Sequence, residues 1–282
     1  MSLDSYANLK LEIADHLERD DLTSQIDTFI DLAESRHKRE VRIKEMMTRT
    51  FLLSSDTSTI TGATAANPVV ITTSADHNLD NGDRVYISGV AGMTQLNTNF
   101  YLISNKTSTT FELTDINGTS FSSYSSGGVV TVAGIKNRQE PLPEGYLETI
   151  TLRLLTSPVT LINEVSYHEM NRLRKESTGK PSYYVVSNEF EFNYIPDSTY
   201  KAEIVYWEAQ TALSSANTSN DVLVRAPDLY LYGALTAAEP FLMNDARIQT
   251  WAALYLTGLE TLNTSDRRKG GLLVSRPAGM VY

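Results

Sequence analysis

Histidine is the side chain that most often carries acid–base and metal chemistry in proteins, and this chain of 282 residues contains four. They are His16, His37, His77 and His168, and each stands apart from the others in the sequence. His168-Glu169 is not followed by a second histidine at the spacing of a zinc-binding helix motif. The chain has no cysteine, which excludes disulfides, thiolate metal ligands and cysteine nucleophiles. We therefore expect no metal site.

The other residue patterns that support catalysis are also missing from the sequence. There is no phosphate-binding loop ending in Gly-Lys-Ser/Thr, no glycine pattern of a dinucleotide site and no Gly-x-Ser-x-Gly nucleophile motif. Carboxylates are plentiful, so the sequence alone leaves open a pair of acids of the glycosidase type. We expect no active site, no cofactor and no enzymatic activity.

The composition changes abruptly at residue 55 and changes back at residue 136, which indicates an insert inside a different host domain. Residues 55–135 are rich in Thr, Ser, Asn and Gly and contain six acidic but only two basic side chains. Short β-branched runs separated by glycine turns predict an all-β barrel or sandwich. These runs are 68–73, 83–88, 99–104, 109–114 and 129–133.

The host before the insert shows helical periodicity. Tyr6, Leu9, Ile13 and Leu17 predict one amphipathic helix. A second helix follows, with Thr23 or Ser24 as its N-cap and a buried stripe of Ile26, Phe29, Ile30 and Ala33. Residues 48–53 read as a strand that leads into the insert.

The host after the insert alternates at first and is helical later. We expect strands at 148–155, 159–167 and 200–207, a hairpin at 183–192, and a polar loop at 213–220. A helix should begin at Pro227 and end or kink near Ala237, because Pro240 cannot donate a backbone hydrogen bond. Asn244 can cap a last helix, whose apolar stripe is Ile248, Trp251, Tyr255, Leu259 and Leu262.

The predicted fold class is therefore α+β. We expect a helical-bundle domain with a small antiparallel sheet, formed by residues 1–54 and 136–265, that is interrupted by a barrel-like insertion at 55–135. Residues 266–282 should form an extended C-terminal arm. Aromatic residues are frequent between 183 and 207; they could stack on bases or sugars, but their alternation within strands favours a sheet core.

Two segments are candidate contact surfaces. The end of the second helix is basic, and its cations suit either an acidic partner or, as the sequence favours, a helix C-terminus facing solvent. The residues of this basic contact patch are Arg36, Lys38, Arg39, Arg42 and Lys44. The C-terminal arm is apolar without periodicity, which favours docking on a neighbouring chain over a disordered end. Its docking residues are Leu272, Leu273, Val274, Arg276, Met280, Val281 and Tyr282.

Charge and hydropathy limit the partners. The formal net charge of −10 argues against wrapping nucleic acid, which needs concentrated Lys and Arg, but it is compatible with a wall past which DNA slides. The first residues have neither a basic start nor an apolar run, and no stretch approaches the roughly 18 apolar residues of a membrane span. We expect a protein without a signal peptide and without a membrane partner.

The host pieces resemble the head-to-tail connector, or adaptor, proteins of tailed bacteriophages. The resemblance covers most of 1–54 and 136–265 and is a pattern match without a catalytic signature. The segments that carry it are Leu22 to Glu40, Gly179-Lys180-Pro181-Ser182-Tyr183-Tyr184, Pro227 to Leu235, and Ala237 to Leu242 with Trp251 and Tyr255.

The insert resembles a small β-barrel module found in phage structural proteins and similar to the first catalytic-cysteine half-domain of ubiquitin-activating enzymes. Ubiquitin chemistry does not carry over, because the chain has no cysteine and lacks the rest of that enzyme. The matching residues are Pro68 to Thr72, His77-Asn78-Leu79, Asn81 to Val90, Leu96-Asn97 and Thr110 to Leu113.

The adaptor resemblance implies a structural protein of the virion neck, assembled in the host cytoplasm. It implies a homo-oligomeric ring, twelve-fold, between the portal protein and the tail, which continues the DNA channel without binding DNA specifically. The barrel would project as a collar toward tail or fibre proteins. The alternative is a carbohydrate-binding adhesin or tail accessory protein, which predicts saccharide binding by the insert.

Overall fold

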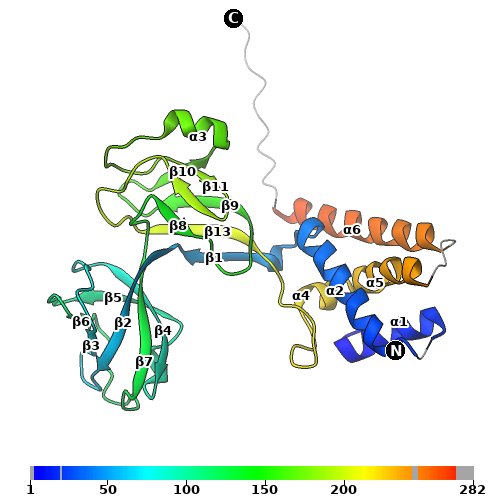
Figure 1. The fold of residues 1–282 in the computed structure, drawn as a ribbon, viewed down its shortest axis with the longest axis horizontal. Helices are drawn as coiled ribbons and strands as arrows, with labels where there is room; N and C mark the ends of the chain where they lie inside the picture. Colours follow the sequence, from blue (N-terminus) through cyan, green and yellow to red (C-terminus); the bar gives the residue numbers. More distant parts are fainter. Residues whose placement is uncertain (1–2, 20, 243–246, 271–282) are drawn as a thin grey trace, which may run out of the picture. The chain divides into compact units, whose positions relative to one another are not determined.

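The computed structural model describes residues 3–19, 21–242 and 247–270, with side chains as far as Thr264. The chain divides into two compact units: Met1–Thr48 with Trp207–Tyr282, and Arg49–Tyr206. We call them the helical unit and the β unit. The described residues are mixed α and β, which confirms the expected class, but they are largely β (Figure 1). The description as a helical bundle with a small sheet is therefore not confirmed.

The helical unit is built around α5 (Pro227–Phe241), which is buried over most of its circumference. α1 (Tyr6–Leu17), α2 (Thr23–Glu40), α4 (Asp221–Arg225) and α6 (Ile248–Gly270) all contact α5. Gly233 allows the closest approach, because a Cβ atom there would lie 3.1 Å from the Cβ of Ala33 and 3.4 Å from the Tyr255 ring. A helix so covered must be the core of its unit.

The first two helices follow the predicted stripes. Leu9, Ile13 and Leu17 of α1 are buried, as are all four predicted stripe residues of α2. The predicted N-cap of α2 is wrong: Thr23 and Ser24 lie inside its first turn, and the N-cap residue is Leu22, which makes no side-chain cap hydrogen bond.

The last two helices are longer than predicted. α5 ends at Phe241 and not near Ala237, because Pro240 lies in its last turn, where a missing N–H removes only one intrahelical hydrogen bond. α6 continues to Gly270, past the end of its apolar stripe. The predicted cap Asn244 lies outside the described residues.

Seven strands form one sheet in the order β1-β13-β9-β10-β11-β12-β8. The sheet is larger than predicted and not wholly antiparallel, since β10 pairs with β11 in parallel. Two parallel strands must be joined by a crossover connection, and here that connection contains α3 (Tyr167–Leu173). The strand predicted at 159–167 is therefore shorter and ends at Glu164. The strands are β1 (Met47–Phe51), β8 (Gln139–Pro141), β9 (Tyr146–Leu154), β10 (Thr160–Glu164), β11 (Tyr183–Val186), β12 (Glu189–Phe192) and β13 (Ala202–Glu208).

One face of this sheet carries an aromatic core. Phe190 and Phe192 are fully buried, Tyr184 and Tyr206 are nearly so, and all four pack with aliphatic side chains from β9, β10 and β13. The alternation of these residues along their strands therefore reflects packing, as the sequence favoured, and not a stacking platform for bases or sugars.

The remaining strands close into a barrel in the order β2-β3-β6-β5-β4-β7, with β7 paired back to β2. Five of its six strands were expected near these positions; β2 was not. Gly128 is needed where β7 crosses the core, because its φ is +102° and a Cβ there would lie 2.6 Å from Val90. The strands are β2 (Leu53–Ala63), β3 (Val70–Thr73), β4 (Arg84–Ala91), β5 (Asn99–Ser104), β6 (Thr110–Leu113) and β7 (Ser126–Ala133).

Candidate functional site

The four histidines lie in four separate environments. The Nδ1 atom of His16 is 2.9 Å from the carbonyl oxygen of Glu12 in the preceding turn. His77 is buried in the barrel, where Nδ1 accepts a hydrogen bond from the Leu79 N–H and Nε2 lies 3.3 Å from the Thr110 carbonyl oxygen. His168 is exposed on α3. Within the described ranges, no group of three or more His, Cys, Asp or Glu side chains could hold a metal ion.

His37 has a strongly shifted pKa. It lies in the core of the helical unit, with its ring edge-on to Tyr230 at 4.6 Å between centroids and parallel to Tyr255 at 6.0 Å. Burial lowers the pKa of His37 to about 4, so the ring is neutral at physiological pH. A neutral ring packed between two aromatic side chains is part of the core and not a proton carrier.

Glu34 lies one turn before His37 and connects a loop to the core. Its Oε1 atom accepts hydrogen bonds from the Leu213 N–H at 2.7 Å and from the Tyr230 hydroxyl at 3.2 Å. Burial raises the pKa of the Glu34 carboxyl and also raises the pKa of Tyr230. This contact fixes the polar loop after β13 onto α2 and α5.

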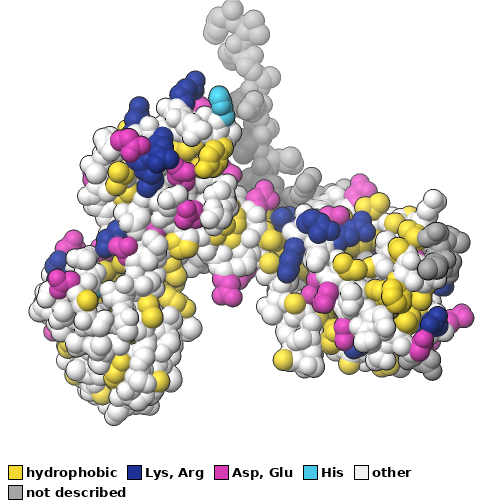
Figure 2. Space-filling view, in the orientation of Figure 1, with side chains coloured by type: hydrophobic (Ala, Val, Ile, Leu, Met, Phe, Trp, Pro, Cys, Tyr) yellow, Lys and Arg dark blue, Asp and Glu magenta, His cyan; other side chains and the backbone are white. Residues whose placement is uncertain are grey.

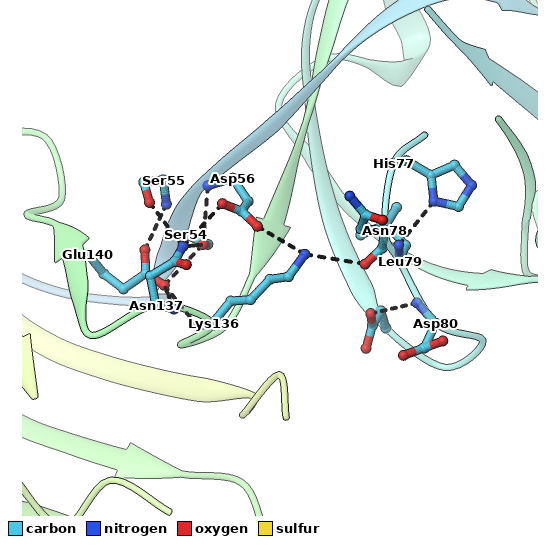
Figure 3. A network of polar contacts seen from close by, with 11 residues as sticks. Ser54, Ser55, Asp56, His77, Asn78, Leu79, Asp80, Lys136, Asn137 and Glu140 are labelled. Carbon is cyan, nitrogen blue, oxygen red and sulfur yellow. Dashed lines mark hydrogen bonds and ion pairs between the residues drawn. The ribbon is translucent and has the colours of Figure 1, made fainter. Parts of the chain in front are cut away.

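A second buried carboxylate, Glu140, joins the barrel to the sheet within the β unit (Figure 3). Its Oε2 atom accepts the Ser55 N–H at 2.7 Å. Its Oε1 atom accepts the N–H groups of Lys136 and Asn137 at 2.8 and 2.7 Å and the Ser54 hydroxyl at 3.0 Å. One side chain of β8 thus binds both connections between barrel and sheet.

Burial raises the pKa of Glu140, although all four donors favour its charged form. Outside this carboxylate, Lys136 forms an ion pair with Asp56 at 2.9 Å and donates to the Asn78 carbonyl oxygen at 3.2 Å. Although burial opposes the shift, Lys136 and Asn137 hold the pKa of Asp56 below its usual value. We call the set Ser54, Ser55, Asp56, Lys136, Asn137 and Glu140 the barrel joint.

Several side chains of the predicted basic patch contact other residues of the helical unit. The Arg36 guanidinium lies 3.8 Å from the Tyr255 ring centroid and bonds Glu40 at 3.0 Å. Arg42 donates to the carbonyl oxygens of Lys38 and Val41, and Lys44 lies 3.8 Å from Glu45. Figure 2 shows Lys and Arg side chains gathered near the C-terminal end of α2. Lys38, Arg39 and Lys44 are the exposed members.

A groove of about 640 Å³ opens on the helical unit between α1, the start of α2 and the loop after β13. Tyr6, Ala7, Leu11 and Ala14 of α1 form one wall, and Leu11 is 54 % exposed. The other wall includes Ile26 of α2. An apolar groove on the outside of a helix is typical of a docking site for another chain.

Comparison with known families decides what kind of protein carries these features. Residues 112–277, more than half of the chain, match the family model described as SU10 adaptor protein. The chain belongs to the SU10 adaptor protein family. A second match, to the FCCH domain of ubiquitin-activating enzyme E1, covers residues 66–133. Both predicted resemblances are thereby confirmed. No curated protein matches the chain.

The SU10 adaptor family places this protein among the structural components of bacteriophage particles. The FCCH match covers strands β3 to β7 of the closed barrel. None of the helices in the described ranges has the length and hydropathy that a bilayer span requires.

Sequence reasoning found some of the adaptor's site residues and missed others. The docking residues from Leu272 to Tyr282 lie outside the described residues, so their role stays a prediction. Glu34 and His37 continue the predicted stripe of α2 at helical spacing, and this signal could have identified them. Glu140 has no such signal, because Ser54 and Ser55 lie 86 and 85 residues away along the chain.

Proposed function

We propose that this adaptor forms a closed ring of identical subunits, twelve-fold, between the portal and the tail. The ring continues the DNA channel and provides a platform for tail or fibre proteins. The observation that carries this proposal is the family match over residues 112–277, which spans most of the β unit's sheet and three helices of the helical unit. A ring needs two different faces on each subunit, since its contacts are head-to-tail.

The charge of the chain supports passage of DNA without binding. The formal net charge is −10, and phosphate affinity depends on clustered Lys and Arg. Within the basic patch, Arg36 pairs with Glu40. The barrel contributes six acidic and two basic side chains, so it fits a protein-facing collar better than a DNA contact.

The experiment is to mix the purified chain with the portal protein and measure the mass and symmetry of the product by native mass spectrometry and electron microscopy. We expect a ring with one adaptor per portal subunit and a central channel. A chain that stays monomeric beside the portal, or that binds it as a single copy, contradicts the proposed function. Saccharide binding by the barrel would favour the adhesin alternative instead.

A further inference from the structure

The groove of the helical unit is lined by a stripe of apolar side chains on α1. Ala7, Leu11 and Ala14 are spaced by four and three residues, so they lie on one helix face. Leu11 is 54 % exposed and stands between two alanines. Because the two alanine side chains are small, the groove has space for large apolar side chains from another segment. The Lys10 side chain on its rim is bound to Asp27 at 2.5 Å.

The two ends of the helical unit carry opposite charge. Residues 3–31, which form α1 and the first half of α2, contain eight acidic and two basic side chains, a net −6. The end of α2 has the basic patch, and residues 267–282 contain four basic and no acidic side chains, a net +4. The groove therefore lies at the acidic end, and residues 267–282 are complementary to it in charge and in apolar content.

Helix direction places the end of α6 far from the groove of its own copy. α6 begins beside α1, where Arg247 donates to the His16 carbonyl oxygen at 3.4 Å. Its later part lies beside the end of α2, where Asn263 contacts Glu40 and Arg42. α2 and α6 thus run in the same direction, and Gly270 lies roughly 33 Å along the axis from Ile248 at a rise of 1.5 Å per residue.

Twelve residues, 271–282, follow Gly270. Leu272 to Val274 lie only two to four residues beyond Gly270, and four fully extended residues reach about 14 Å, so these side chains fall short of the groove of the same copy. A second copy brought alongside removes this limit. We propose that residues 271–282 of one copy bind the α1–α2 groove of the next copy, with Leu272, Leu273 and Val274 against Leu11 and its neighbours. This inference rests on the proposed ring.

The first test measures binding of a fluorescently labelled peptide of residues 267–282 to the full-length chain by anisotropy. We expect saturable binding that weakens with added salt. Leu11→Ser should lower the affinity at least about tenfold, since it removes one apolar contact without changing charge. Leu32→Ser is the matched control, because Leu32 is 52 % exposed on α2 but does not line the groove. Equal affinities for both variants, or no binding to the wild type, would overturn the proposal.

The second test uses the absence of cysteine to distinguish binding between copies from binding within one copy. Chains with Ala7→Cys and differently tagged chains with Ser275→Cys are mixed and oxidised. We expect cross-links between the two tags. Val224→Cys, at 72 % exposed on α4, replaces Ala7→Cys in the control and should give few. A double Ala7→Cys, Ser275→Cys chain that closes only on itself contradicts the proposal.

Failure of this inference is distinct from failure of the ring. If the wild type assembles on the portal while Leu11→Ser binds the peptide as tightly as the wild type, the groove assignment is wrong and the ring stands. If the peptide binds in the groove but no ring forms on the portal, the proposed function is wrong.

Discussion

Glu140→Gln is the sharpest test of the barrel joint. The substitution keeps the shape of the side chain but replaces one carboxylate oxygen by an amide that donates. The oxygen that accepts from Ser54, Lys136 and Asn137 can be retained, so the amide must then face the Ser55 N–H, which the carboxylate contacts at 2.7 Å. One charge-assisted hydrogen bond is lost, and a backbone donor has no acceptor.

The cost follows from these contacts. A hydrogen bond to a charged group contributes about 1.5–3 kcal/mol, and relief from burying a charge offsets part of its loss. We expect the local free energy of opening to fall by roughly 2–3 kcal/mol, with the amides of Ser55, Lys136 and Asn137 exchanging roughly 30-fold to 150-fold faster. Hydrogen exchange measured by mass spectrometry on peptides covering residues 53–57 and 134–140 reports this change.

The matched control is Glu144→Gln, which removes the same charge from an exposed position four residues away. It should leave exchange at both segments within a few tenths of a kcal/mol of the wild type. Unchanged exchange at Ser55, Lys136 and Asn137 in Glu140→Gln, or an equal change in Glu144→Gln, would show that the Glu140 carboxylate does not stabilise the barrel joint.

Four further predictions concern the rest of the chain. Replacing residues 56–134 by a short Gly/Ser linker should leave a cooperatively melting protein, whereas removal of 56–135 should lower its stability, because Ile135 is buried in the sheet core and exchanges two hydrogen bonds with Tyr200; calorimetry compares the two. Between pH 6.5 and about 4 the unfolded chain binds a proton at His37 that the folded chain does not, so the contribution of His37 to the unfolding free energy should fall by roughly 3 kcal/mol; His37→Phe should remove this part of the pH dependence measured by urea titrations. Deletion of Gly271–Tyr282 should leave the melting temperature nearly unchanged and abolish assembly onto the portal, and undiminished docking would contradict it. Purified protein should contain no stoichiometric transition metal and show no hydrolase or transferase activity; a metal lost on changing one histidine would show otherwise.

The sequence predicted those parts of the fold whose signals are local. The stripes of α1 and α2 and five barrel strands have strong periodicity, and the structure has elements at those places. β2 was missed because Ser54 to Thr59 is almost entirely polar, and only its pairing with β3 and β7 makes it a strand. The parallel pairing of β10 with β11 joins strands that are separated in the sequence by α3, and no local sequence pattern indicates which strands pair.

The same distinction holds for the candidate sites. The basic patch was visible as charge, but its contacts were not: the position of Arg36 over the Tyr255 ring depends on packing between α2 and α6. The groove is a product of where α1 lies against α2, so no spacing in the sequence could indicate it. Independent folding of residues 55–135 stays a prediction, since the compact units divide the chain at other positions.

The closure of the barrel has a consequence for engineering. Its first and last strands pair with each other, and Leu53 lies directly opposite Ala133 in their register. The two connections therefore leave the sheet about 5 Å apart, the ordinary separation of facing residues in neighbouring strands. An insertion point with neighbouring ends is suited to a domain whose own N- and C-termini lie close together. The adaptor could in this way carry an enzyme, a fluorescent protein or an affinity module at the same place, provided that the donors bound to Glu140 are kept.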